Sequence, residues 1–210
     1  MGARGEGFPW WVRVLRHLGH AGGGRATGAM RVWLAWEAFW VPRLRAVRPG
    51  SLVRYALGTH HGRPVRLQDG VLVSRGDRLL ELHMDNRTLL RLASSGFDPF
   101  AADRLGSGEL HELATAIRSG ALGPVRALHA VTPFAPALRR QDFEVRPVPH
   151  TVAFWFTRLY MTGLFALYHP SGWAALTPHR ARRWPSEVWM SRERFLQRMS
   201  ATAPPAVPAP

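Results

Sequence analysis

The sequence predicts an α+β fold in which one mixed sheet of about five strands carries helices on its faces. The first observation is the stretch 65–86, VRLQDGVLVSRGDRLLELHMDN, where an Asp-Gly pair at 69–70 and a Gly-Asp pair at 76–77 separate short apolar runs. Such turn pairs between apolar runs indicate a β-meander. The second is the helix–strand–helix–strand pattern of 103–148. With 210 residues, of which 46% are hydrophobic and 20% charged, the chain can form one domain with a core.

The individual elements follow from hydrophobic periodicity and from turn or cap residues. Apolar residues at 110, 113, 114 and 117 share one helical face, and Ser191 is a good N-cap for a final helix. Strands are expected at 51–60, three times within 65–84, at 125–132 and at 143–148. Helices are expected at 30–41, about 86–94, 109–119, 133–141, 151–167 and 191–199, with a loop at 96–108.

The chain is expected to form one domain over 30–200, between a Gly- and Arg-rich leader at 1–29 and a Pro-rich tail at 201–210. No signal peptide fits the start, because Arg13 and Arg16 interrupt its apolar run. Met30 opens the first convincing helix and is an alternative start of the protein. We therefore expect a cytoplasmic protein, with peripheral contact to a membrane as an option.

The apolar stretch 151–167 has about the minimum length of a membrane span. Arg158 lies at its centre, however, and an arginine at the middle of a bilayer costs about 2.5–3.5 kcal/mol even on the lenient insertion scale. The stretch is therefore expected to be a buried helix or one at an interface.

Charge and composition narrow the partners and the chemistry. The chain has no cysteine and no lysine, which excludes thiol nucleophiles, Cys-based zinc sites and Schiff bases. Residues 1–50 hold 8 arginines and 2 glutamates, and 171–210 hold 6 and 2, whereas 51–170 hold 14 arginines against 10 acids. Eight of the nine tryptophans also lie in the two flanks. Arg- and Trp-rich flanks favour contact with an anionic membrane surface or with nucleic acid, but sequence-specific DNA recognition is unlikely without a helix-turn-helix or zinc-finger pattern.

The strongest candidate site lies on the strand before residue 86. Side chains alternate along a strand, so Glu81, His83 and Asp85 are expected on one face. Two carboxylates and an imidazole at this spacing could bind a divalent metal or supply an oriented general base. The competing interpretation is a solvated face whose acids are paired with arginine. One of His60 and His61, which adjoin a turn, could join His83.

Two segments carry a resemblance to a known family. The run Glu81-Leu82-His83 with Asn86, and the segment EVWMSRERFLQRM at 187–199, are similar to the YkoP-like domain, a small bacterial domain found alone or appended to polysaccharide deacetylases. The resemblance covers about 51–200. It implies the fold and an accessory or binding role connected with envelope polysaccharide, and it assigns no role to individual residues.

A second resemblance concerns 103–148, which looks like the second half of the GNAT acetyltransferase fold. In that family, a Gly-rich loop at a helix N-terminus binds the pyrophosphate of coenzyme A through backbone N–H groups. Gly106 and Gly108 match the two small positions of this loop, but Asp103 stands where the family has Gln or Arg, and Arg104 is displaced by one. The resemblance implies acetyl-CoA as a cofactor, with Glu81 or His83 as the base.

Three functions remain open from the sequence. The leading one is a non-catalytic accessory or binding domain of the YkoP-like type, without a cofactor or metal, that contacts envelope polysaccharide. The first alternative is an N-acyltransferase that uses acetyl-CoA. The second is a nonspecific binder of an anionic surface or nucleic acid through the Arg- and Trp-rich flanks.

Overall fold

The computed structural model describes residues 39, 41–86, 88, 99–133, 135–149, 151–168 and 185–201. Several sequence predictions lie outside these residues. They concern the leader at 1–29, most of the helices expected at 30–41 and about 86–94, the Arg- and Trp-rich parts of both flanks, and the tail after 201.

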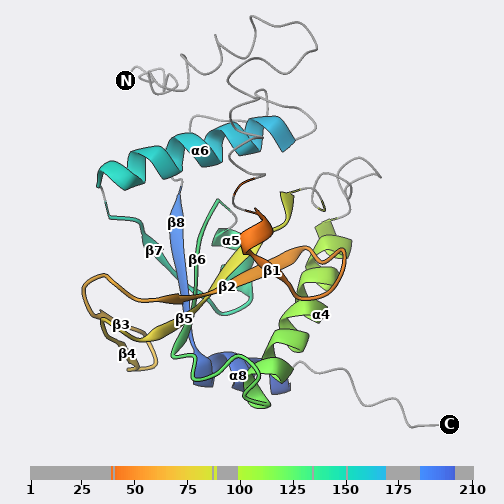
Figure 1. The fold of residues 1–210 in the computed structure, drawn as a ribbon, viewed down its shortest axis with the longest axis vertical. Helices are drawn as coiled ribbons and strands as arrows, with labels where there is room; N and C mark the ends of the chain where they lie inside the picture. Colours follow the sequence, from red (N-terminus) through yellow and green to blue (C-terminus); the bar gives the residue numbers. More distant parts are fainter. Residues whose placement is uncertain are drawn as a thin grey trace, which may run out of the picture.

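The described elements form an α+β fold around a mixed sheet of six strands, which confirms the predicted class. The strand order is β1-β2-β5-β6-β8-β7 (Figure 1). The strands are β1 (Arg45–Ala46), β2 (Val53–Thr59), β5 (Arg78–Met84), β6 (Ala127–Thr132), β8 (Ser186–Ser191) and β7 (Glu144–Pro147). Strands β5 and β6 run parallel, and the other neighbours pair antiparallel. Neither β1 nor β8 was predicted.

The predicted meander is confirmed in its turns and in the pairing of its first two strands, but the pairing expected for its third strand is wrong. Strands β3 (Val65–Arg66) and β4 (Leu72–Val73) pair with each other in a separate two-stranded sheet, and β5 pairs with β2 instead. Gly70 and Gly76 have φ of 85° and 95°, as expected at turn positions that other residues resist. The β3–β4 hairpin departs from the main sheet because its apolar side chains pack onto the sheet's surface rather than extend its edge.

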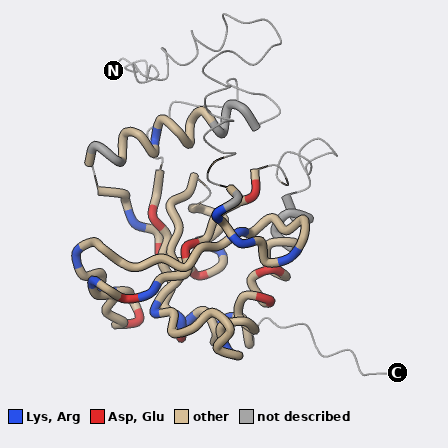
Figure 2. Tube along the Cα trace, viewed as in Figure 1, with Lys and Arg blue, Asp and Glu red and all other residues tan. Residues whose placement is uncertain are grey.

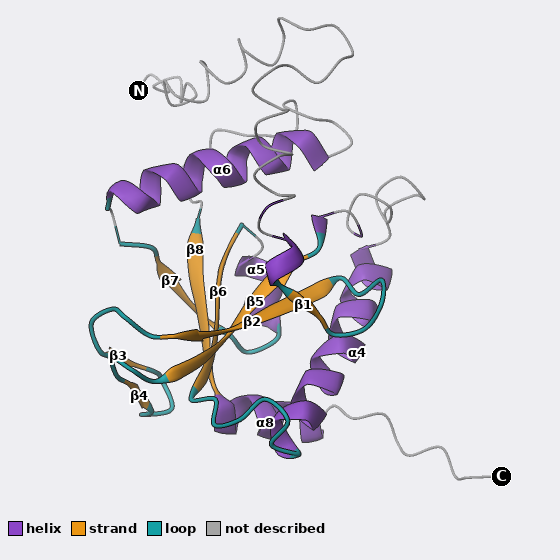
Figure 3. Ribbon diagram, viewed as in Figure 1, coloured by secondary structure: helices purple, strands orange, loops and turns teal. Residues whose placement is uncertain are grey.

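Helices α4 (Pro99–Arg118), α5 (Ala135–Arg140) and α8 (Arg192–Ala201) cover one face of the main sheet (Figure 3). We call this the inner face. Leu80, Leu82 and Leu128 project from it and are packed in one core with apolar side chains of the three helices. The N-cap predicted for the last helix is confirmed, since the backbone N–H of Arg194 donates to the hydroxyl of Ser191.

The prediction of a loop at 96–108 is wrong, because helix α4 begins at Pro99 and continues for 20 residues. Proline is favoured in the first turn of a helix, where its missing N–H costs nothing, so an Asp-Pro pair at 98–99 was a usable start signal. The glycines at 106 and 108 each disfavour a helix by about 1 kcal/mol relative to alanine. Burial of Leu110, Leu113 and Ile117 in the core outweighs that preference.

Helix α6 (Val152–Tyr168) crosses one end of the sheet, and α8 lies at the opposite end (Figure 1). Arg158 is buried within α6, and its guanidinium lies 5.6–5.7 Å from the ring centroids of Phe154 and Trp155. Trp155 and Phe156 are exposed on the same helix. Among the described helices, none is long and apolar enough to cross a membrane.

Candidate functional site

The face of the main sheet opposite the helices, here called the outer face, changes character along its length. At one end the β3–β4 hairpin covers it, and Leu67 and Val73 of the hairpin pack against Leu79, Ala127 and Trp189. Two residues further along β5 and β6, the same face carries polar side chains. This place is the outer-face cluster, made of Glu81, His83, His129, His60 and Trp189.

Strand pairing brings the cluster together. Glu81 on β5 lies opposite His129 on the parallel strand β6, and His129 in turn lies opposite Trp189 on β8. On its other side, Glu81 is paired with Ala56 of β2. Neighbouring strands are about 4.8 Å apart, so side chains at paired positions on one face contact each other.

A glycine makes room for the Glu81 carboxylate. A Cβ atom at Gly58, on the neighbouring strand β2, would lie 2.5 Å from Oε1 of Glu81. The carboxylate therefore extends over β2 at the one position of the strand that has no side chain. Glycine weakens a strand interior, and here it allows this close approach.

His83 lies next to this carboxylate without touching it. Its Nε2 is 4.0 Å from Oε2 of Glu81, which is too long for a hydrogen bond. The two side chains keep 42% and 39% of their surface exposed, so a ligand can reach both. Partial burial lowers the pKa of His83, so its imidazole is neutral at pH 7.

His129 is the most perturbed titratable group of the cluster. Burial lowers its pKa to about 4, and the imidazoles of His60 and His83 add to this effect. Its ring stacks on Trp189 with centroids 4.1 Å apart, and His60 meets the same indole edge-on at 5.7 Å. Nε2 of His129 is buried and has no hydrogen-bond partner among the described residues. At neutral pH the Glu81 side chain thus lies beside two neutral imidazoles, those of His83 and His129.

Asp85 does not join Glu81 and His83 as a free third group. Asp85 follows the end of β5, and only 3% of its surface is exposed. Its carboxylate accepts a hydrogen bond from Nε of Arg54 and another, 2.7 Å long, from the backbone N–H of Thr88. These partners lower the pKa of Asp85 in spite of its burial. The period-two pattern was right for Glu81 and His83, but it was carried past the strand end to a residue that serves as a cap.

Gly106 and Gly108 lie inside α4, so the expectation that they open this helix is wrong. In the helix interior each backbone N–H donates to the carbonyl four residues earlier. The N–H groups of these glycines are therefore not available to bind a pyrophosphate. The glycines are also remote from the cluster, because α4 packs on the inner face.

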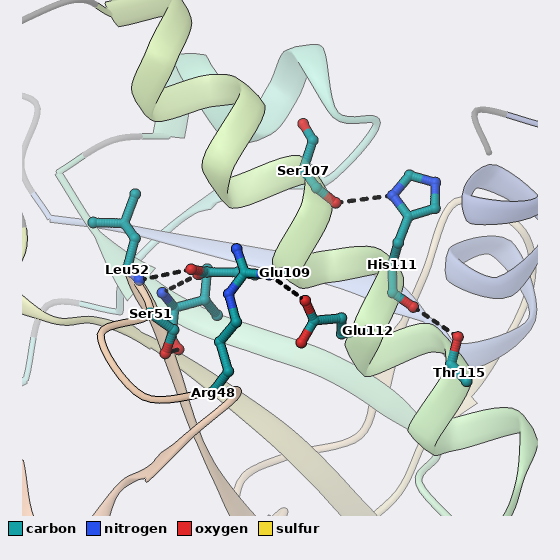
Figure 4. Close-up of polar contacts among 9 residues, drawn as sticks. Arg48, Ser51, Leu52, Ser107, Glu109, His111, Glu112 and Thr115 are labelled. Carbon is teal, nitrogen blue, oxygen red and sulfur yellow. Dashed lines mark hydrogen bonds and ion pairs between the residues drawn. The ribbon is translucent and has the colours of Figure 1, made fainter. Parts of the chain in front are cut away.

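The neighbours of these glycines tie the helix to the sheet (Figure 4). Glu109 is fully buried, and its carboxylate accepts the backbone N–H groups of Leu52 at 2.9 Å and Val53 at 2.6 Å, where β2 begins. Arg48 donates to Glu112 on the same helix at 2.6 Å. These contacts tie α4 to the start of β2 and to the segment before it.

Within the described part of the chain, no three His, Asp or Glu side chains are placed to hold a metal ion. His61 is exposed in the turn after β2, and Nε2 of His60 lies 2.8 Å from the carbonyl of Arg63. His60 does not join His83 in a common ligand set. It contacts Trp189, and both histidines lie close enough to His129 to lower its pKa.

Sequence reasoning missed His129 and Trp189. Both alternate with buried apolar residues in their strands, which identifies the face that they occupy. Which strand lies beside which, however, depends on the crossover of α4 and on the insertion of β8 between β6 and β7. No local pattern in the sequence contains that information.

The two parallel strands that carry the cluster pair over only three positions. Their register ends at Glu81 and His129, although β5 runs on to Met84 and β6 to Thr132 without pairing to each other. The outer-face cluster therefore lies where β5 and β6 begin to part. Beyond these three positions, the two strands share no ladder hydrogen bonds.

Comparison with known proteins is consistent with the sequence similarity at 81–86 and 187–199. The profile of the YkoP domain matches residues 26–199, which is most of the chain. The chain belongs to the YkoP domain family. Neither curated proteins nor solved structures gave a significant match to this YkoP domain. The matched range includes every strand of both sheets and the whole outer-face cluster.

Proposed function

We propose that this YkoP domain is a non-catalytic binding domain whose outer face accepts a segment of cell-envelope polysaccharide. The observation that carries the proposal is the outer-face cluster itself. The Glu81 and His83 side chains are exposed and do not hydrogen-bond to each other. Beside Glu81, β2 has the small residues Ala56 and Gly58. Carboxylate and imidazole groups suit sugar hydroxyls, which both donate and accept hydrogen bonds.

A binding role accords with the geometry of the two ionisable groups better than acid–base catalysis does. A general base and the group that orients it are normally within about 2.6–3.2 Å of each other. The Glu81 and His83 side chains are 4.0 Å apart. The link to polysaccharide comes from the occurrence of YkoP-like domains appended to polysaccharide deacetylases, and it belongs to this proposal.

Calorimetric titration of the whole protein with envelope oligosaccharides tests the proposal. We expect binding in the micromolar range, weakened at least tenfold by His83→Ala. His61→Ala, at an exposed turn beside the cluster, is the matched control and should bind like the wild type. Absence of binding to any peptidoglycan, chitin or cellulose fragment would contradict the proposal.

An N-acyltransferase is a second candidate, and the parting of β5 from β6 favours it. Unused amides between two parallel strands could hydrogen-bond the amide groups of an acyl carrier such as acetyl-CoA. The position of Gly106 and Gly108 inside α4 speaks against it. Titration with acetyl-CoA separates the two candidates, since the binding-domain proposal predicts no heat of binding.

Contact with an anionic surface is a third candidate. The chain carries a net charge of +14, and Trp155 and Phe156 are exposed on α6. Figure 2 shows basic and acidic positions interspersed along the described elements, without one basic face in that view. If this candidate is correct, affinity for anionic vesicles or nucleic acid will fall steeply with salt and will not depend on His83.

A further inference from the structure

Glu81 stands apart from the other carboxylates of the described chain. Four acids contact arginine side chains: Asp85 contacts Arg54, Glu112 contacts Arg48, Glu144 contacts Arg146 and Asp142 contacts Arg198. Glu109 is satisfied by two backbone N–H groups. Asp69, Asp77, Glu187 and Glu193 likewise each have a donor or an arginine nearby.

Within the described chain, Glu81 forms no ion pair with an arginine. The ionisable side chain near it is His83, whose Nε2 lies 4.0 Å from Oε2 of Glu81, and the depressed pKa of His83 leaves that ring uncharged at pH 7. With 28 arginines against 14 acids in the chain, an acid without a cation is unexpected. A half-buried carboxylate without a counter-charge attracts a cation from outside.

The neighbouring imidazoles add lone pairs, and the arginine opposite His83 on β2, Arg54, contacts Asp85. A neutral imidazole offers one nitrogen as an acceptor. Nε2 of His129 is buried without a partner in the same cluster, on the strand paired with that of Glu81. The cluster therefore presents the Glu81 carboxylate and the His83 imidazole to a ligand that must supply the donors, whereas Nε2 of His129 is buried.

The spacing selects the kind of cation. Two ligand atoms on a tetrahedral zinc ion lie about 3.4 Å apart, given bonds of about 2.1 Å. The 4.0 Å between Oε2 of Glu81 and Nε2 of His83 is wider than this. An ammonium nitrogen placed about 2.8 Å from both atoms would bridge them with an angle of about 90° between its two hydrogen bonds.

We propose that Glu81 and His83, beside His129, form a binding site for a primary ammonium group, and that its source is an N-deacetylated amino sugar. The ammonium offers three N–H donors and one positive charge, and the carboxylate and the exposed imidazole match the charge and two of the donors. An N-acetyl group at the same place would bring no charge and one N–H donor. The sugar source rests on the proposed polysaccharide-binding function, whereas the ammonium site rests on the Glu81 and His83 side chains alone.

Calorimetric titration of the full chain at pH 7 with glucosamine tetramer and with N-acetylglucosamine tetramer tests the proposal. The wild type should bind the glucosamine tetramer at least tenfold more tightly. Glu81→Gln, which keeps the shape and removes the charge, should abolish this preference. Glu112→Gln is the matched control, because its carboxylate is similarly exposed, at 43%, and already contacts Arg48. That variant should keep the preference.

The possible outcomes separate this inference from the proposed function. Equal affinity for both tetramers would overturn the ammonium site and leave polysaccharide binding intact. Binding of neither would overturn the polysaccharide function and the sugar source together. A further titration with α-acetyl-lysine amide tests the source alone, since tighter binding of this amine than of glucosamine tetramer would keep the ammonium site and overturn the sugar.

Discussion

The two faces of strand β5 differ sharply in burial and polarity. On the inner face, Leu80 and Leu82 are buried in a core shared by α4, α5 and α8. On the outer face, one residue away in the chain, Glu81 and His83 keep about two fifths of their side-chain surface exposed. The difference teaches that the inner face of β5 is packed for stability, whereas Glu81 and His83 on its outer face are polar side chains that the described core does not use. Such groups are available for a ligand.

The sharpest contrast is between Leu80→Ala and His83→Ala. Leu80 is 0% exposed, and removing such a core side chain costs about 2–5 kcal/mol of unfolding free energy. His83→Ala should change stability by less than about 1 kcal/mol, because its ring makes no hydrogen bond to the described chain and is half-exposed. Urea unfolding of both variants checks this. Similar losses would show that the outer face is part of the core.

The pH dependence of stability tests His129, a partly buried titratable side chain of the outer-face cluster. The folded pKa of His129 is about 4 and its unfolded value is about 6.5, so the unfolded chain binds the extra proton between these values. Stability should therefore fall as the pH drops from about 6.5 to about 4, by up to about 3 kcal/mol from this residue. His129→Phe, which keeps an aromatic ring on Trp189, should flatten the profile. An unchanged slope would place the titration elsewhere.

The variants Glu109→Gln and Glu81→Gln compare a carboxylate that accepts hydrogen bonds with one that accepts none in the described chain. The Glu109 carboxylate accepts two backbone N–H groups, whereas an amide offers one oxygen and turns a donor toward the other N–H. The substitution should cost about 1–3 kcal/mol. Glu81→Gln, the same change on the outer face, should leave the unfolding free energy within about 0.5 kcal/mol. Equal costs would mean that Glu81 has a structural partner.

The smallest effect concerns the helix of the inner face. A Cβ atom at Gly106 would meet nothing within 4 Å, and the residue lies in the interior of α4. Gly106→Ala should therefore raise the melting temperature slightly, through a gain of about 0.5–1 kcal/mol. It should leave oligosaccharide binding unchanged. A destabilised variant would show that the glycine is needed for a close approach.

Sequence reasoning succeeded where the information was local. The turns at Gly70 and Gly76, the core face of α4 and the Ser191 cap were all predicted, because each depends on a few adjacent residues. It also placed Glu81 and His83 correctly on one face of their strand.

It failed where distant segments decide. The strand at 186–191 is short and is stabilised by partners on both sides, β6 and β7, which are far away in the sequence. Asp85 was wrongly assigned to the site because its partners, Arg54 and Thr88, could not be identified from the strand pattern. His129 was missed because only the parallel pairing of β5 and β6 brings it beside Glu81.

The most direct test of the outer face as the ligand face is NMR mapping of the full chain with glucosamine tetramer. We predict that the backbone amide signals of Glu81, His83 and His129 will shift most, together with the ring signals of the two histidines. Signals of the inner-face residues Leu80 and Leu128 should move little. Shifts confined to α6 or α8, with an unchanged outer-face cluster, would contradict the account.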